Sequence, residues 1–316
     1  MNECFPFCIE SPAPKALVAW IGGTRVESMG SPLWRGSCTG RTLAPTVDGS
    51  ACRRGAQRGG WEMVQLVRLG MPGSNAYLLR GARTVLVDCG GAEHRDLLAA
   101  ALDAHGCAPS SLSLLLLTHA HAGTAGNARW LQREHHVPVA IHSADAPILA
   151  TGTDRPHRPV GPTAALVSWV GDPRFEAVVP DLVLGHSHPL FKHGVGATTV
   201  YTPGHTIGSV SVLLPSGDAL VGDLLMGGWF GGRVRAHRPV RHYFAECPER
   251  VARSLALLAR LGAERLHPAI GEELAMAEVR AALHVDDAAP SVGSSPIRRR
   301  ERRLADATPR GELRPT

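Results

Sequence analysis

The sequence predicts an α/β (α+β) fold with mixed β-sheets, and two observations support this. Short apolar runs bounded by turn residues, which are typical of buried strands, alternate with segments whose leucines recur at helical spacing. The strands first lie near helices, then follow one another as a meander, and then meet helices again, which suits a layered domain. We expect strands at 63–69, 75–79, 84–87, 112–117, 137–141, 198–201, 209–214 and 219–221, and helices at 95–105, 126–136, 249–261 and 272–283.

These elements lie in the middle of a chain of 316 residues, and both ends differ from them in composition. Residues 1–62 show neither a helical nor a strand period. They are interpreted as a disordered or spurious extension, translated ahead of a start at Met63. Residues 286–316 are rich in arginine, serine and proline and are predicted to be a disordered basic tail. The folded domain is therefore expected at 63–285.

The positive charge of the chain is concentrated at its ends. The formal net charge is +5, with +3 in residues 1–60 and +4 in residues 291–316, so the middle carries −2. A folded face that binds nucleic acid needs an excess of lysine and arginine, which the middle lacks. We therefore expect a small-molecule substrate rather than a nucleic-acid partner.

Neither a membrane protein nor a disulfide scaffold fits the sequence. No apolar run approaches the ~18 residues of a membrane-spanning helix. The seven cysteines are an odd number without a pattern of pairs. We found no secretory signal pattern, so the expected location is the cytoplasm.

The residues that suggest chemistry follow a buried strand, in the segment Thr118-His119-Ala120-His121. Residues i and i+2 of an extended chain point the same way, so both imidazoles can face one point in space. Two other strand ends offer comparable groups: His205 lies on a turn after 198–201, and Asp223 follows 219–221. Three histidines and one carboxylate suit zinc, or iron.

These segments resemble the metallo-β-lactamase superfamily, in particular its glyoxalase II-like hydrolases. The resemblance covers roughly 63–285, and its motifs occur in the family's order. It implies an αββα sandwich, in which two mixed β-sheets are flanked by helices and metals bind at one edge. It also implies that His119, His121, His205 and Asp223 are metal ligands. The motifs are Leu86–Gly90, Thr118–His121, Thr202–Ser209 and Gly222-Asp223.

The chain departs from the family at the second of its two metal positions. The family's Asp and following His are replaced by Gly123 and Thr124, and its last His is replaced by Ile270. An isoleucine cannot bind a metal, and a threonine is a poor substitute. We therefore expect at most one tightly held metal, in a site of three histidines beside Asp223.

The expected activity is hydrolysis of an ester, thioester, lactone or amide. A zinc ion held by three histidines lowers the pKa of a bound water to about 7 and polarises a carbonyl. Asp223 is the candidate catalytic residue, because it can complete the coordination or hold the water. Two alternatives stay open: a mononuclear iron (Fe²⁺) enzyme resembling sulfur dioxygenases, and a non-catalytic member of the fold that binds a small molecule or a partner.

Other polar residues near these motifs receive less specific interpretations. Asp88, Thr118 and Thr206 are expected to support the ligand loops through hydrogen bonds. His186 and His188 are expected in a surface turn, and His267 could replace the lost last ligand only through a change of register. The glycine-rich segment after Asp223 can overhang the metal edge, so three side chains there are candidate substrate contacts: Trp229, His242 and Tyr243.

Overall fold

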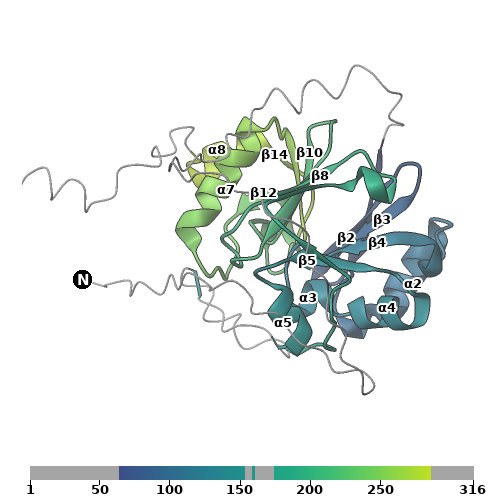
Figure 1. The fold of residues 1–316 in the computed structure, drawn as a ribbon. Coiled ribbons are helices and arrows are strands. Elements are labelled where there is room, and N and C mark those ends of the chain that lie inside the picture. Colours follow the sequence, from purple (N-terminus) through teal and green to yellow (C-terminus); the bar gives the residue numbers. More distant parts are fainter. Residues whose placement is uncertain (1–63, 154–158, 161–173, 286–316) are drawn as a thin grey trace, which may run out of the picture. The chain divides into compact units, whose positions relative to one another are not determined.

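A computed structural model describes residues 64–153, 159–160 and 174–285, all within one unit of the chain, Asp48–Thr316. The predictions for 1–62 and 286–316 therefore fall on residues outside the described ranges. The described residues form two six-stranded sheets with helices on their outer faces (Figure 1). The predicted αββα sandwich is confirmed.

The first sheet has the order β1-β2-β3-β4-β5-β6. Strands β1 to β3 pair antiparallel, whereas β3 to β6 pair parallel, so the sheet is mixed. Its strands are β1 (Gln65–Met71), β2 (Ser74–Arg80), β3 (Thr84–Val87), β4 (Leu112–Leu116), β5 (Val139–His142) and β6 (Leu182–Leu184).

The second sheet has the order β14-β13-β10-β9-β8-β7 and is mixed as well, because β10 and β13 pair parallel. A separate two-stranded sheet, β11 (Met226–Trp229) with β12 (Val234–Val240), follows Asp223. The strands of the second sheet are β7 (Ser187–Pro189), β8 (Thr198–Tyr201), β9 (Val210–Leu213), β10 (Asp218–Gly222), β13 (Arg265–Pro268) and β14 (Leu274–Ala275).

Helices cover the outer face of each sheet. Around the first sheet lie α2 (Arg95–Ala104), α3 (Ala122–Ala125), α4 (Ala128–His135) and α5 (Ala146–Thr151), and around the second lie α7 (Pro248–Arg260) and α8 (Met276–Leu283) (Figure 1). Short 3₁₀ turns occur at Ala92–His94, Pro109–Ser111 and Leu190–His193.

The alternation of side chains along the central strands produces the layers. In β3, Val85 and Val87 join the core between the two sheets, whereas Leu86 faces the helices that cover the first sheet. In β10, Leu220 belongs to the same central core, and Val221 packs with the helices of the second sheet. Period-two alternation with apolar residues on both faces is what a strand buried on both sides requires.

The structure corrects several sequence-based boundaries. Residues 272–283 were predicted as one helix, but Leu274-Ala275 pairs with β13 and α8 begins at Met276. The glycine-rich segment after Asp223, for which no strand was predicted, forms β11 and β12. His188 lies on β7 rather than in a turn, whereas His186 does precede that strand. Strands 84–87 and 198–201 match their predictions residue for residue.

The strand ends, rather than the strands, position the functional side chains. Strands β3 and β4 run parallel, so Asp88 and Thr118 leave the first sheet at the same edge. The main-chain N–H of Val210 donates to the carbonyl of Thr118, which ties the start of β9 to that edge. Within the described ranges no helix has the length and apolar character needed to cross a membrane.

Candidate metal centre

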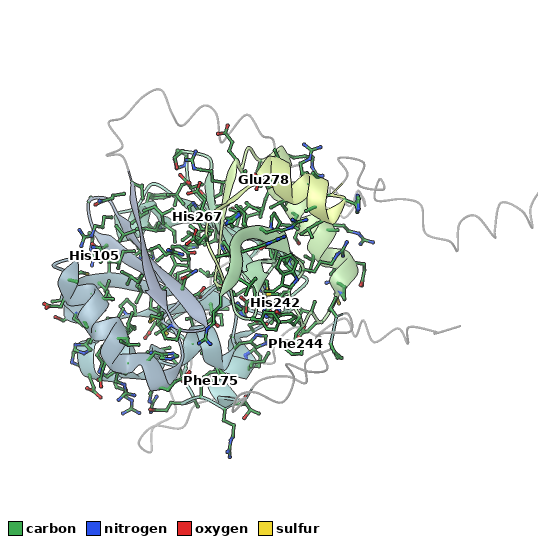
Figure 2. The ribbon with its side chains drawn as sticks, turned by 180° about the vertical axis from the view of Figure 1, so that it is seen from behind. His105, Phe175, His242, Phe244, His267 and Glu278 are labelled. Atoms are coloured by element: carbon green, nitrogen blue, oxygen red, sulfur yellow. The ribbon has the colours of Figure 1, made fainter. Side chains whose placement is uncertain are left out.

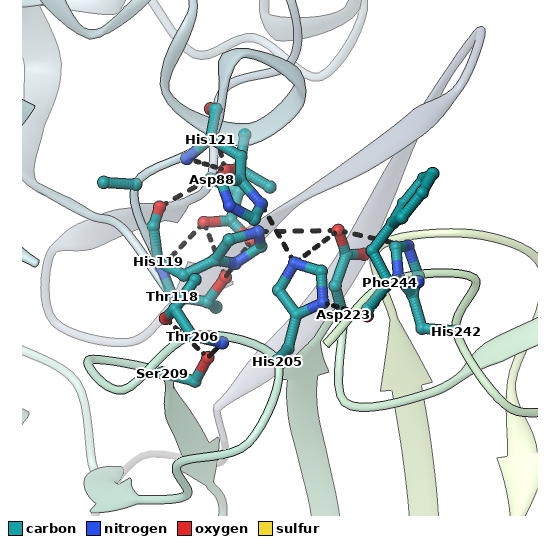
Figure 3. Close-up of polar contacts among 12 residues, drawn as sticks. Asp88, Thr118, His119, His121, His205, Thr206, Ser209, Asp223, His242 and Phe244 are labelled. Carbon is teal, nitrogen blue, oxygen red and sulfur yellow. Dashed lines mark hydrogen bonds and ion pairs between the residues drawn. The ribbon is translucent and has the colours of Figure 1, made fainter. Parts of the chain in front are cut away.

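Four side chains meet where β4, β8 and β10 end. One ligand atom from each of His119, His121, His205 and Asp223 lies within 4.8 Å of the other three. The three imidazole rings are 4.7 Å apart in every pair and stand edge to face (Figure 3). The structure thus brings together all four residues that the sequence predicts as metal ligands. Their coordination of a metal stays a prediction.

A chain of hydrogen bonds behind His119 fixes the orientation of its ring. The Thr118 hydroxyl donates to the buried carboxylate of Asp88 at 2.9 Å, and the Thr118 main-chain N–H donates to the same carboxylate at 2.8 Å. Nδ1 of His119 lies 2.9 Å from the Thr118 hydroxyl oxygen. Because the hydroxyl proton points to Asp88, Nδ1–H of His119 is the donor in this contact. Nε2 then carries the lone pair.

Nε2 of His119 faces the centre of the cluster. It is buried, has no hydrogen-bond partner among the described residues, and lies 3.4 Å from Oδ2 of Asp223. Two ligand atoms on one tetrahedral zinc ion, each about 2.1 Å from it, are ~3.4 Å apart. An orphaned imidazole nitrogen at this distance from a carboxylate fits a metal ligand, and a second hydrogen-bonded nitrogen is the usual support for one.

The main-chain carbonyl of Phe244 orients His205 in the same way. Nδ1 of His205 lies 3.0 Å from this oxygen, which can only accept, so Nδ1 carries the proton and Nε2 the lone pair. Nε2 lies 3.6 Å from Oδ2 of Asp223 and 2.9 Å from Nδ1 of His121. His121 is therefore the donor in the contact between the two imidazoles. To offer Nδ1 to a metal, His121 must move that proton to its other nitrogen.

Asp145, which the sequence analysis did not single out, supports two ligand loops at once. Its Oδ2 accepts hydrogen bonds from the main-chain N–H of Ala120 at 3.1 Å and from the Thr206 hydroxyl at 2.7 Å. It therefore links the His119–His121 segment to the His205 turn. A Cβ at Gly208 would lie 2.3 Å from the Asp145 carboxylate, so glycine is required there. Thr206 acts as the predicted hydrogen-bond support.

The charges within the cluster favour the metal-binding protonation states of Asp223 and His205. Burial opposes ionisation of Asp223, but the imidazoles of His242, His119 and His205 outweigh it and hold its pKa well below the ordinary value. Burial, followed by the charges of His242 and His119, lowers the pKa of His205 well below 6.5. An ionised carboxylate beside a neutral imidazole is the form that binds a metal. Burial also opposes protonation of His119, but Asp223 outweighs it and raises that pKa.

The three candidate substrate contacts occupy different environments. Nε2 of His242 lies 3.6 Å from Oδ2 of Asp223, on the loop between β12 and α7. The Tyr243 ring is buried, and its hydroxyl accepts a hydrogen bond from the main-chain N–H of Phe230 at 3.0 Å. Trp229 is half-buried at the end of β11, with the guanidinium of Arg238 5.9 Å from the centre of its ring. Substrate contact by these residues stays a prediction.

The positions of the family's missing ligands hold no substitute at the same place in the chain. A Cβ at Gly123 would meet nothing within 4 Å, so this position is open space. The Thr124 hydroxyl bonds to the carbonyls of His119 and His121, and Ile270 packs in an apolar cluster with Met226. None of these groups is available as a ligand.

His267 does not replace the lost histidine either. Its Nε2 lies 2.9 Å from Oδ1 of Asp218, on the neighbouring strand β10. The guanidinium of Arg265 also donates to this carboxylate, at 2.7 Å to each oxygen. Figure 2 shows His267 apart from His242 and Phe244.

Comparison with known proteins identifies the family. The profile of the metallo-beta-lactamase superfamily matches residues 69–243, more than half of the chain. The chain therefore belongs to the metallo-beta-lactamase superfamily, as the sequence motifs predicted. No curated protein matches the sequence.

Solved structures that are similar to this chain share little sequence with it. The MIM-2 metallo-beta-lactamase is 19% identical, with a TM-score of 0.51, over 78% of this chain and 90% of its own. TTHA1623, solved in a di-iron-bound form, is 27% identical with a TM-score of 0.48, over 69% of this chain and 97% of its own. The native FEZ-1 metallo-beta-lactamase from Legionella gormanii is 19% identical with a TM-score of 0.38, over 49% of this chain and 56% of its own. The match thus spans little more than half of FEZ-1.

Proposed function

We propose that this protein is a zinc-dependent hydrolase with one tightly bound metal ion, held by His119, His121 and His205 and completed by Asp223. The observation that carries the proposal is the convergence of four ligand atoms within 4.8 Å, in a buried site. The histidine tautomers set by Thr118 and Phe244 support it. Zinc is proposed because three imidazoles and one carboxylate form a typical zinc donor set.

Each residue of the site has a separate role in the proposed hydrolysis. When zinc is bound, it lowers the pKa of a water molecule and polarises a substrate carbonyl. Oδ1 of Asp223 is buried and has no hydrogen-bond partner among the described residues, so it is placed to accept a proton from the attacking water. Asp88 and Asp145 hold the ligand loops at a fixed separation. Precise placement of this kind is what a hydrolytic metal site requires.

The proposed substrate is a small ester, thioester, lactone or amide. A recess of about 20 Å³ borders Asp223 and His242, and its other walls include Leu224, Phe244 and Val251. Such a space holds about one water molecule or one methyl-sized group. Arg241 also lines the recess, but most of its walls are apolar and favour an uncharged group of the substrate beside Asp223. Trp229, His242 and Tyr243 remain the candidates for further contacts.

Two other functions use the same residues. An iron enzyme would use His119, His205 and Asp223, which together form a two-histidine, one-carboxylate set. A non-catalytic role is supported by Gly123, Thr124 and Ile270, which stand where the family's usual pattern has three metal ligands. We rank both below the hydrolase, because the three-histidine set is retained in full.

The activity is tested on a panel of carboxylic esters, thioesters and lactones. We expect the wild-type chain, supplied with Zn²⁺, to hydrolyse at least one of them at least ~100-fold faster than the double variant His119→Ala/His121→Ala. His237→Ala is the matched control, because His237 is exposed on β12 and belongs to no site. Equal rates for the wild type and the double variant would favour the non-catalytic function, and oxygen uptake with iron would favour the dioxygenase.

A further inference from the structure

His242 lies close to the cluster without belonging to the set of four. Its Nε2 is 3.6 Å from Oδ2 of Asp223, and its ring stands perpendicular to that of His205, with the ring centres 4.5 Å apart. His119 and His205 approach the same oxygen at 3.4 and 3.6 Å (Figure 3). Asp223 therefore lies between His242 and the three other histidines.

The separation of His242 from Asp223 is too long for a hydrogen bond and suits a shared ion. Hydrogen bonds between nitrogen and oxygen are ~2.7–3.2 Å long. Two atoms that bind one zinc ion are ~3.4 Å apart, close to the observed 3.6 Å. The same Oδ2 lies 3.4 Å from His119 and 3.6 Å from His205, so this oxygen is placed to be shared between two ions.

The main chain of Phe244 also contacts the ring of His242. Nδ1 of His242 lies 3.0 Å from the Phe244 carbonyl, the same oxygen that accepts from Nδ1 of His205. If Nδ1 donates to it, Nε2 presents a lone pair towards Asp223. The Phe244 main-chain N–H is 3.2 Å from the same Nδ1 and would require the opposite tautomer. The two contacts require opposite tautomers, and metal binding by Nε2 requires the one in which Nδ1 donates to the Phe244 carbonyl.

Among the described residues, the groups that could replace the lost second-site ligands are absent or engaged elsewhere. The family's second-site ligands are absent at Gly123, Thr124 and Ile270, and His267 is bound to Asp218. The recess that borders Asp223 and His242 provides room for one small ligand such as water. His242 reaches the metal edge from a different part of the fold than any of the lost groups.

We propose that Nε2 of His242 and the Asp223 carboxylate hold a second divalent metal ion, with Asp223 shared between two metal positions. This inference rests on the proposed function, since Asp223 also completes the three-histidine site. Two protein ligands bind less tightly than four, so the second ion is the weaker one and water completes its coordination. A centre of this kind loses its second ion on dilution or dialysis and regains it when the metal is supplied.

The test is a titration of the metal-free full-length chain with Co²⁺ and with Zn²⁺, in which the ions bound are counted at each free metal concentration. We expect two binding steps for the wild type and for His237→Ala. In His242→Ala the tight step is retained, and the second step is lost or weakened ~100-fold or more. His242→Gln serves as a second variant, and circular dichroism reports whether each variant is folded.

The outcomes separate this inference from the proposed function. A single step in the wild type up to millimolar metal, or two unchanged steps in both His242 variants, would overturn the second position. A single step that weakens in the His242 variants would also overturn it, because His242 would then bind the first ion. His119→Ala tests the tight position by itself: if its tight step is unchanged, the proposed function fails regardless of His242.

Discussion

The carbonyl of Phe244 accepts a hydrogen bond from Nδ1 of His205 at 3.0 Å, although 39 residues separate the two in sequence. A main-chain oxygen can only accept, so this contact fixes the tautomer of His205 and directs its Nε2 to the cluster. Phe244 lies on the loop after β12, which also carries His242. The loop therefore controls the protonation pattern of the site from outside the strands that bear its ligands.

Thr118→Val tests the corresponding support behind His119. The substitution removes the hydroxyl that links Asp88 to Nδ1 of His119, while the shape of the side chain changes little. We expect the affinity for Zn²⁺ to fall ~10–100-fold, as for other groups that orient a metal ligand. Competition with a chelator measures it. Thr151→Val, at the end of α5, is the control, and equal affinities in the two variants would contradict the role of Thr118.

Gly222→Ala tests the close approach between β10 and His119. Gly222 has φ +52°, and a Cβ there would lie 2.6 Å from the Thr118 hydroxyl. Gly106 has φ +62°, but a Cβ there would meet nothing within 4 Å. Both alanine variants should lose about 1–2 kcal/mol from left-handed backbone strain. Only Gly222→Ala should also bind metal more weakly, and chemical denaturation together with metal titration separates the two effects.

The pKa of Asp88 leads us to expect that the stability of the metal-free protein depends on pH. Burial raises the pKa of Asp88 to about 7, although the charge of His119 and the hydrogen bonds from Thr118 oppose it. The ordinary value is 3.8, so the folded state binds this proton more tightly than the unfolded state. The contribution of Asp88 to the free energy of unfolding is therefore greatest below pH ~4 and decreases as the pH rises to ~7.

Urea unfolding of the wild type and Asp88→Asn between pH 4 and 8 measures this contribution. Other groups titrate in both proteins, so the difference between the two curves isolates Asp88. We expect the wild type to lose stability relative to Asp88→Asn as the pH rises through this range. A difference that does not change with pH would show that Asp88 is ionised in the folded state throughout.

Asp218→Asn tests whether the cluster of Arg265, Asp218 and His267 is structural. Burial raises the pKa of Asp218, but the hydrogen bonds from Arg265, Ser216 and His267 outweigh it and hold this pKa well below its ordinary value. Loss of these charged hydrogen bonds should cost about 1–3 kcal/mol of stability. Neither Asp218→Asn nor His267→Ala should change the number of metal ions bound per chain. A metal ion lost in His267→Ala would instead make His267 a ligand.

The sequence predicted the parts of the fold that have strong local patterns. Strands 84–87 and 198–201 were correct because apolar and β-branched residues fill them and turn residues bound them. Strand β12 was missed because most of its residues are exposed, and they include two arginines, a histidine and a proline. Strand β14 was missed because two residues pair with β13 just before a helix, and nothing in their identity separates them from it.

In the site, too, only the residues with a strong local sequence pattern could be predicted. His119, His121, His205 and Asp223 could be predicted because spacing and strand ends place them. The support from Asp145 and Phe244 could not, because one is a lone carboxylate at a helix start and the other acts through its main chain. His242 was predicted only as a pocket residue, since its distance to Asp223 depends on the path of the loop after β12.

The metal content of the purified full-length chain tests the central claim most directly. The protein is loaded with a mixture of Zn²⁺ and Fe²⁺ under anaerobic conditions, dialysed, and analysed by elemental mass spectrometry beside His119→Ala and His237→Ala. We predict about one zinc per chain after dialysis in the wild type and in His237→Ala, and almost none in His119→Ala. Iron in place of zinc would contradict the proposed metal, and equal metal content in all three proteins would contradict the three-histidine site itself.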